Sequence, residues 1–438
     1  MIRFLFFVRF FYIRGMQEDF LHYIWKHKKI DFGELKTTNN EDLIINSVGT
    51  YNTNSGPDFF NSKIKIGNQL WAGNVEIHVK SSDWFLHNHE TDMNYDNVIL
   101  HVVWEEDTEV FRKDNTVLPT LELNSLVKPN TLENYRNLFS KGNKWINCEN
   151  DFNSISPFLM NNWLERLYFE RLERKSGAMD TMLKSSKNNW EAVLFKMLLK
   201  NFGLKVNGNA FGSLGNSIDF SIVRKVQSNH LSLEALLFGQ MGLLENSIEN
   251  AYYMELSKEY KFLKQKFGLD NTNVIPAQFF RLRPLNFPTI RLSQLACLYN
   301  KHQNLFSKII ETSTIEDFYD LLNVGTSNFW NTHYTFQKES KARVKMLSKS
   351  FIDLLLINTV LPLKFSYNKQ NGISDDSILI DMANAIKPEK NNVISAFNRL
   401  KDVANTSLHS QALIQLKSEY CNKHRCLQCA IGNSILNK

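Results

Sequence analysis

The sequence predicts an α/β amino-terminal domain with a mixed sheet, followed by a larger and mostly α-helical domain. Short runs of strand character lie before about residue 125, and amphipathic helical patterns dominate after about residue 150. At 438 residues, the chain is also longer than one ordinary core. We therefore expect an α/β domain over residues 16–150 and a helical domain over residues 151–438, the latter carrying a cysteine cluster at its carboxyl end.

Composition limits the class of protein. Hydrophobic residues make up 43% and charged residues 22% of the chain, which fits a globular protein rather than a disordered one. The apolar runs are shorter than the roughly 20 residues that cross a bilayer, so we expect no stable membrane insertion. A net charge of +6 permits DNA or RNA as a partner. Five cysteines without a disulfide pattern indicate a reducing, cytoplasmic location, and nothing indicates an oligomeric state.

The first fifteen residues differ from the rest. They are rich in aromatic residues but are interrupted by Arg3, Arg9 and Arg14, and no small-residue cleavage site of a secretory signal follows them. Met16 opens an ordinary polar sequence. We interpret residues 1–15 as an extension or a mis-assigned start, with an interfacial helix or a helix packed on the core as alternatives.

The elements of the first domain begin with a helix. Phe20, Tyr23 and Ile24 recur at helical spacing and predict a helix from Gln17 to about Lys29. Runs of strand character follow at Asp42–Val48, Phe59–Ile66, Leu70–Lys80, Val98–Trp104 and Pro119–Leu123. A polar and aromatic segment between the third and fourth runs predicts a helix or a long loop. A hairpin, a crossover and then an apolar strand together predict a mixed sheet.

The second domain is predicted to be helical throughout. Amphipathic helices are expected at Asn161–Lys175, Asn189–Phe202, Leu231–Leu244, Ala251–Phe267, Ile315–Leu322, Arg343–Leu356 and Val393–Leu400. No fixed-period repeat and no long low-complexity linker separates them.

One proline-containing segment, Phe280–Arg291, interrupts the helical pattern. Pro284 and Pro288 are expected to prevent a regular helix through it. Its three guanidinium groups are candidates for binding substrate phosphates, and they belong to Arg281, Arg283 and Arg291. The alternative is a rigid loop whose arginines cap helices or pair with carboxylates.

The strongest chemical pattern lies on the third predicted strand. Because side chains alternate between the faces of a strand, one face would carry Asn74, Glu76, His78 and Lys80. The residues between them are aliphatic and would pack inward. Asp58 follows a Gly-Pro turn at the start of the preceding strand, where hairpin pairing would bring it beside Glu76. Two such carboxylates suit Mg²⁺ or Mn²⁺, and His78 or Lys80 could orient or deprotonate a water molecule.

This pattern resembles the PD-(D/E)xK nuclease superfamily, whose members have the restriction-endonuclease-like fold. The resemblance implies that Asp58 and Glu76 are the two metal-binding acids of a nuclease. His78 stands where that superfamily usually has lysine, and Lys80 on the same face is the alternative. Because of that departure, a non-catalytic nucleic-acid-binding protein with a degenerate nuclease-like core is a second hypothesis. A scaffold or protein-interaction module is the third.

Further polar residues follow the same strand. His87 and His89 are candidates for substrate binding beside the acid pair, and with Asp92 they could instead form a separate site for zinc or another soft ion. A third interpretation is that they cap and solvate a surface helix. Trp84 followed by His-x-His is similar to very-short-patch-repair endonucleases. His101 lies in an apolar strand and is expected to be a hydrogen-bonded core histidine.

Longer segments resemble one family. They are QEDFLHYIWK, GPDFFNSKIKIGNQLWAGNVEIHVKSSDW, YDNVILHVVW, FRLRPLNFPTIRL and CNKHRCLQCAIGN. They resemble the bacterial family known as domain of unknown function 2851, from about Met16 to the carboxyl end. That resemblance implies the domain plan and leaves the chemistry to the residues.

Three cysteines crowd the carboxyl end. Cys421, Cys426 and Cys429 are close enough in sequence to share one soft metal centre, either zinc or an iron–sulfur cluster. Candidates for a fourth ligand are Cys148, His424 and His409. Some nucleases of the superfamily named above hold their termini with an iron–sulfur cluster. The alternative is a set of reduced thiols packed at a helical end.

Overall fold

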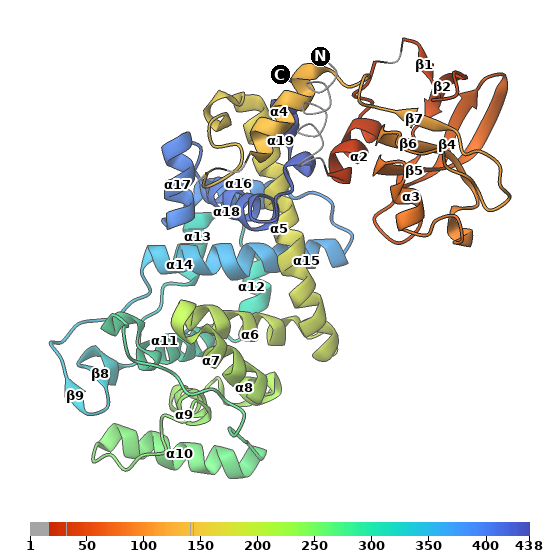
Figure 1. Cartoon of the computed structure of the whole chain (residues 1–438). Coiled ribbons are helices and arrows are strands. Elements are labelled where there is room, and N and C mark those ends of the chain that lie inside the picture. The colour runs from red at the N-terminus through yellow and green to blue at the C-terminus, as the bar shows by residue number, and fades with distance from the viewer. Residues whose placement is uncertain (1–16, 32, 141, 143) are drawn as a thin grey trace. The chain divides into compact units, whose positions relative to one another are not determined.

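The computed structural model describes residues 17–438 except 32, 141 and 143 (Figure 1). The chain forms two compact units, one of residues up to Met160 together with Ser418–Lys438, and the other of Asn161–Lys417. A mixed-sheet unit and a larger helical unit are therefore present, as predicted. The last 21 residues belong to the mixed-sheet unit, whereas the sequence analysis placed them in the helical domain. The expected extension over residues 1–15 lies outside the described residues.

A mixed sheet forms the centre of the first unit. Its main path runs β1-β2-β4-β5-β6-β7, and β3 pairs with β4. The strands are β1 (Leu35–Lys36), β2 (Asp42–Ser47), β3 (Thr50–Tyr51), β4 (Phe59–Ile66), β5 (Gln69–Lys80), β6 (Val98–Glu105) and β7 (Thr120–Glu122). β2, β4 and β5 form an antiparallel meander, and β5, β6 and β7 are parallel. The predicted order of hairpin, crossover and apolar strand is confirmed.

The helices of this unit cover the sheet and connect its strands. They are α2 (Glu18–Lys26), α3 (Asp83–Leu86), η1 (Met93–Tyr95), α4 (Pro129–Phe139), η2 (Phe152–Ser154), η7 (Cys426–Gln428) and α19 (Ala430–Leu436). The apolar face of α2 contacts β5, and α3 with the turn after it forms the crossover between β5 and β6. From the carboxyl-terminal segment, η7 contacts α2 and α19 contacts α4.

β5 is enclosed on both faces over its carboxyl half. Val75 and Ile77 are buried on one face, as the alternation predicts, but Glu76 and His78 on the other face are only 5% and 1% exposed. Trp84 from α3 is buried beside them. Because parallel sheets are usually covered on both faces, Glu76 and His78 lie in a closed layer, whereas the Lys80 side chain at the end of the strand is 42% exposed.

The second unit is an assembly of helices. They are α5 (Pro157–Ser185, which begins in the first unit), α6 (Trp190–Phe202), α7 (Leu204–Ser217), α8 (Phe220–Val226), α9 (His230–Gln240), α10 (Ala251–Phe267), η3 (Pro284–Asn286), α11 (Pro288–Lys301), α12 (Leu305–Glu311), α13 (Ile315–Leu321), η4 (Asn328–Asn331), α14 (Lys349–Leu355), η5 (Leu356–Val360), α15 (Leu361–Gln370), α16 (Ser377–Ala385), α17 (Asn392–Leu400), α18 (Ser407–Gln415) and η6 (Leu416–Cys421). A small hairpin joins β8 (His333–Thr335) to β9 (Lys338–Glu339). Each of the seven predicted helices has a counterpart.

The proline-containing segment is not one loop. Pro288 occupies the first turn of α11, where its missing N–H leaves no helical hydrogen bond unmade. Arg291 consequently lies in α11 and is buried, which corrects the expectation that it lies on a loop with Arg281 and Arg283. Those two arginines are exposed.

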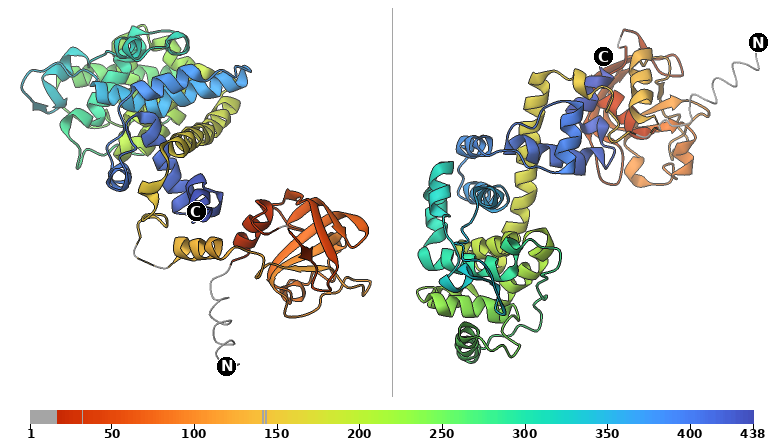
Figure 2. Two further views of the ribbon diagram at one scale, coloured as in Figure 1. Left: turned by 90° about the horizontal axis from the view of Figure 1, so that it is seen from above. Right: turned by 90° about the vertical axis from the view of Figure 1, so that its left-hand side faces the viewer.

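Figure 2 shows α14, η5 and α15 as one continuous helical rod. By length and composition, Lys349–Gln370 could span a membrane, but 72% of its apolar window is buried inside the protein. Its centre is the π-helical turn η5, and Lys175 of α5 donates hydrogen bonds there to Ile357 O at 3.3 Å and Asn358 Oδ1 at 3.0 Å. The Lys175 amino group thus binds acceptors in the π-helical turn, where the backbone hydrogen bonds depart from the regular α-helical pattern.

Lys175 predicts a pH dependence of stability. Burial, with a smaller effect of Arg171, lowers the pKa of Lys175 to about 7. Between that value and the unfolded value of about 10.4, the unfolded chain binds one more proton, so the free energy of unfolding rises with pH. We expect wild type to gain stability relative to Lys175→Met between neutral pH and about pH 9.5, by up to about 1.4 kcal/mol per pKa unit. Urea denaturation at both pH values measures this gain. Lys184→Met, at an exposed site on the same helix, should show no such difference. If the free energy of unfolding of Lys175→Met changed with pH as much as that of wild type, the prediction would be contradicted.

Candidate functional site

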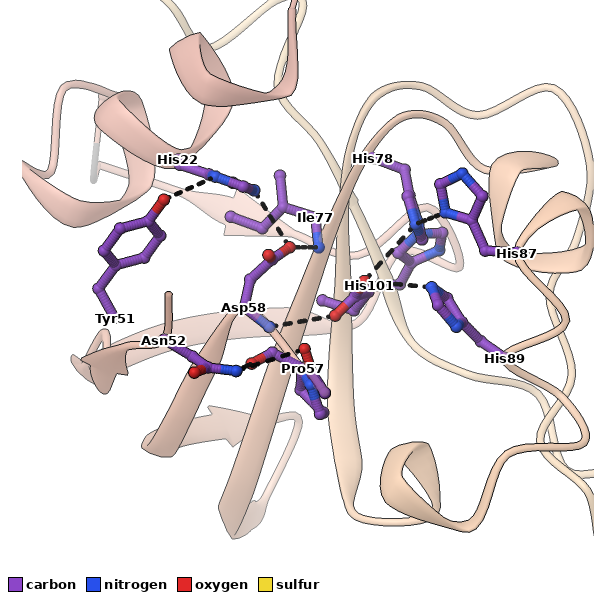
Figure 3. A network of polar contacts seen from close by, with 12 residues as sticks. His22, Tyr51, Asn52, Pro57, Asp58, Ile77, His78, His87, His89 and His101 are labelled. Atoms are coloured by element: carbon purple, nitrogen blue, oxygen red, sulfur yellow. Dashed lines mark hydrogen bonds and ion pairs between the residues drawn. The ribbon is translucent and has the colours of Figure 1, made fainter. Parts of the chain in front are cut away.

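A braced loop presents Asp58 at the start of β4. Gly56 has a φ of 95°, a conformation that side chains with a Cβ rarely adopt. The Asn52 amide nitrogen donates to four successive carbonyls of this loop, including Pro57 O at 3.0 Å (Figure 3). A β-bulge follows at Asn61. The loop and the bulge together determine where the Asp58 carboxylate lies.

The two predicted acids contact each other through the backbone. The Asp58 N–H donates to Glu76 Oε2 at 3.2 Å, and the Ile77 N–H donates to Asp58 Oδ2 at 3.0 Å. Burial and the nearby Asp58 raise the pKa of Glu76 to about 9. Without a nearby cation, Glu76 therefore binds a proton at neutral pH. A divalent ion would replace that proton.

His22 of α2 pairs with Asp58. Its Nε2 lies 3.1 Å from Asp58 Oδ2, and its Nδ1 lies 3.4 Å from the Tyr51 hydroxyl. Burial lowers the pKa of His22, but the hydrogen bond and the charge of Asp58 outweigh burial, and the net pKa is raised. His22 and Tyr51 lie on one side of β5, opposite the other histidines of the site (Figure 3). Sequence reasoning missed His22, for which the only signal was its i, i+4 spacing from Glu18.

Two histidines lie against the second oxygen of Glu76, and a third lies against one of them. His89 Nε2 and His78 Nε2 lie 3.3 Å and 3.6 Å from Glu76 Oε1, and His87 Nδ1 lies 3.1 Å from His78 Nε2. The ligand atoms of the three histidines all lie within 4.8 Å of one another. Bonds of about 2.0–2.2 Å to a tetrahedral ion place neighbouring ligand atoms roughly 3.4 Å apart. The three histidines are therefore close enough to share one divalent ion, and Glu76 lies against two of them.

Two of the histidines have lowered pKa values, and a hydrogen bond orients His78. Burial, together with the neighbouring histidines, lowers the pKa of His78 to about 2, and burial lowers that of His89. His78 Nδ1 shares a 2.8 Å hydrogen bond with Nε2 of fully buried His101. If His78 donates this bond, its Nε2 lone pair faces Glu76. Tyr95 stacks on His89 with ring centroids 3.7 Å apart. His101 is thus a buried, hydrogen-bonded histidine that supports the site.

The chemistry of the donor set fits a divalent metal ion. Carboxylate oxygens suit Mg²⁺ and Mn²⁺, and neutral imidazoles suit zinc and other transition metals. His89 lies against Glu76 and His87 lies against His78, so both are beside the acid pair, where they were predicted to bind substrate. Asp92, their alternative partner, caps η1 by accepting from the Asn94 N–H.

Other predicted site residues lie elsewhere. The Lys80 ammonium group pairs with Asp107 Oδ2 at 3.5 Å. Arg281, Arg283 and Arg291 belong to the second unit. The structure therefore brings together Asp58, Glu76 and the three histidines at positions 78, 87 and 89.

The fold and the site define a two-unit protein whose mixed-sheet unit carries a largely buried centre of acids and histidines, of which His87 is exposed. The chain belongs to the family described as protein of unknown function (DUF2851), whose model matches residues 18–392. That match includes every residue of the centre and confirms the family resemblance over residues 18–392, whereas the carboxyl-terminal cysteine segment lies outside the match. No curated protein and no solved structure matches the chain.

Proposed function

We propose that this protein is a metal-dependent nuclease that hydrolyses phosphodiester bonds of DNA or RNA, with a restriction-endonuclease-like first unit. The observation that carries the proposal is Glu76, which contacts the Asp58 backbone through one oxygen and lies against His78 and His89 through the other, with His87 next to His78. Buried ionisable groups whose pKa values are shifted by burial and by charged neighbours are typical of catalytic centres.

Different residues of the site would bind the ion and contact the attacking water. Glu76, His78, His87 and His89 would hold the ion, which lowers the pKa of a bound water and stabilises charge that develops on the phosphodiester. Asp58 Oδ2 is engaged by the Ile77 N–H and His22. Within the described part of the chain, Asp58 Oδ1 accepts no hydrogen bond, so it is available to the ion or to the attacking water.

His22 is the ion-pair partner of Asp58. The hydrogen bond and the charge of Asp58 outweigh burial and raise the pKa of His22, so this pairing favours an imidazolium that stabilises the Asp58 carboxylate and offers a proton donor at the edge of the site. The nucleic-acid substrate is supported by the PD-(D/E)xK-like placement of Asp58 and Glu76 and by the net charge of +6.

Metal addition to stripped protein tests the proposal. Full-length protein freed of metal would be titrated with Mg²⁺, Mn²⁺ or Zn²⁺ by calorimetry, then incubated with single- and double-stranded DNA and RNA. We expect one tight Mg²⁺ or Mn²⁺ ion per chain and cleavage only in the presence of metal. Nucleic-acid binding without cleavage under any metal would favour the non-catalytic hypothesis. Absence of both would favour an interaction module.

A further inference from the structure

Four of the five cysteines belong to the first unit, although one is far from the others in sequence. Cys148 lies between α4 and η2, Cys421 ends η6, Cys426 begins η7, and Cys429 precedes α19. Cys429 is buried and the other three are partly buried. The fifth, Cys297, lies in the second unit.

The structure brings the segment around Cys148 against the carboxyl-terminal segment. Asn147 Nδ2 donates a hydrogen bond to Cys426 Sγ at 3.4 Å, across 279 positions of sequence. Burial raises the pKa of Cys148, and the thiols of Cys421, Cys429 and Cys426 raise it further. The Asn147 contact and the short range of such charge effects both place Cys148 near the three cysteines of the carboxyl-terminal segment.

The spacing of the sulfurs distinguishes two kinds of thiolate centre. A single tetrahedral zinc has Zn–S bonds of about 2.3 Å, which place its sulfurs roughly 3.8 Å apart. Among the residues that the structure describes, no three of these sulfurs lie within 4.8 Å of one another. In a cluster of several metal atoms, the ligand sulfurs lie farther apart than around one ion. An N–H···S hydrogen bond such as that from Asn147 is also a common feature around iron–sulfur clusters.

The other candidates for the fourth ligand fit less well. His424 is exposed and has a φ of 52°. His409 belongs to the second unit. Cys148 is the cysteine that the fold adds to the three at the carboxyl end.

We propose that Cys148, Cys421, Cys426 and Cys429 bind an iron–sulfur cluster that fastens the carboxyl-terminal segment to the first unit. The segment supports the candidate active site, because η7 contacts α2 and α2 carries His22, the partner of Asp58. This inference rests on no part of the proposed nuclease function, and its test needs no activity.

Metal and sulfide analysis of full-length protein purified without oxygen tests the inference. We expect iron and acid-labile sulfide at about four of each per chain, as in a four-iron cluster, with broad visible absorption. Cys148→Ser and Cys426→Ser should lose most of the iron. The matched control Cys297→Ala, in the second unit, should retain it. Limited proteolysis after exposed Lys423 or Arg425 should be faster in Cys148→Ser than in Cys297→Ala.

Three results would overturn the inference. Zinc without sulfide would exclude an iron–sulfur cluster, and full iron retention in Cys148→Ser would exclude Cys148 as a ligand. Wild-type protein that holds no iron after anaerobic purification and reconstitution with iron and sulfide would exclude the site. Circular dichroism separates loss of the cluster from loss of the fold in each variant, and the wild-type measurement does not depend on any variant.

Discussion

Asp58→Asn and Glu76→Gln are each expected to reduce metal-dependent cleavage by about 10²–10⁴-fold. Both substitutions preserve shape and remove a carboxylate. Glu76 lies against His78 and His89, so its loss should also weaken ion binding. Because the pKa of Glu76 is raised to about 9 without metal, glutamine resembles its protonated form, and Glu76→Gln should fold normally. Steady-state kcat/KM at saturating metal, with thermal unfolding of each variant, measures both expectations.

Asp42→Asn is the matched control. Asp42 is an exposed acid at the start of β2 that pairs with Lys36 at 3.8 Å, and its substitution should leave cleavage unchanged. The comparison also tests for a contaminating nuclease, because contamination would give the same cleavage in the site variants as in Asp42→Asn. If Asp58→Asn or Glu76→Gln cleaved as fast as Asp42→Asn, the catalytic centre would lie elsewhere.

The exposed arginines should bind phosphate, whereas the buried one should stabilise the fold. In Arg281→Ala/Arg283→Ala, nucleic-acid binding should weaken, and the slope of log affinity against log salt should fall by about two, since each lost phosphate contact removes about one. Arg291 donates to Gln294 at 2.9 Å and Asn286 at 2.6 Å, and it lies 3.5 Å above the Phe351 ring. Arg291→Ala should therefore cost about 2–4 kcal/mol of stability.

Fluorescence anisotropy over a salt series, with thermal unfolding, separates these outcomes. The folded fraction of Arg291→Ala should retain the wild-type salt slope. If the double variant lost thermal stability and kept its salt slope, Arg281 and Arg283 would be structural residues, and phosphate recognition would have to lie on other groups.

The strands and the acid pair were predictable because both depend on local pattern. The period-two alternation of β5 places Glu76 and His78 on one face, and the apolar run of β6 predicts a strand buried on both sides. Asp58 reaches Glu76 through hairpin pairing between neighbouring strands, which is also a short-range relation. Periodicity and turn chemistry are sufficient for each of these.

The remaining features depend on contacts between distant segments. His22 lies off the apolar stripe of α2, and only packing of that helix on β5 brings it to Asp58. The burial of Arg291 depends on Phe351, sixty positions later. The helix α7 was not predicted because its glycines disfavour helix, yet Gly215 allows close packing against Leu199 of α6. Contacts between segments this far apart in sequence cannot be predicted from the pattern of neighbouring residues.

The return of Ser418–Lys438 to the first unit has a consequence for synthesis on the ribosome. Domains generally fold in order as they emerge, the amino-terminal one first. Here η7 and α19, which cover α2 and α4, emerge only after the whole helical unit has been made. The first unit to be translated is therefore the last to be completed. A nascent or prematurely terminated chain carries Asp58 and Glu76 without the segment that supports α2, so maturation of this centre is postponed until translation ends.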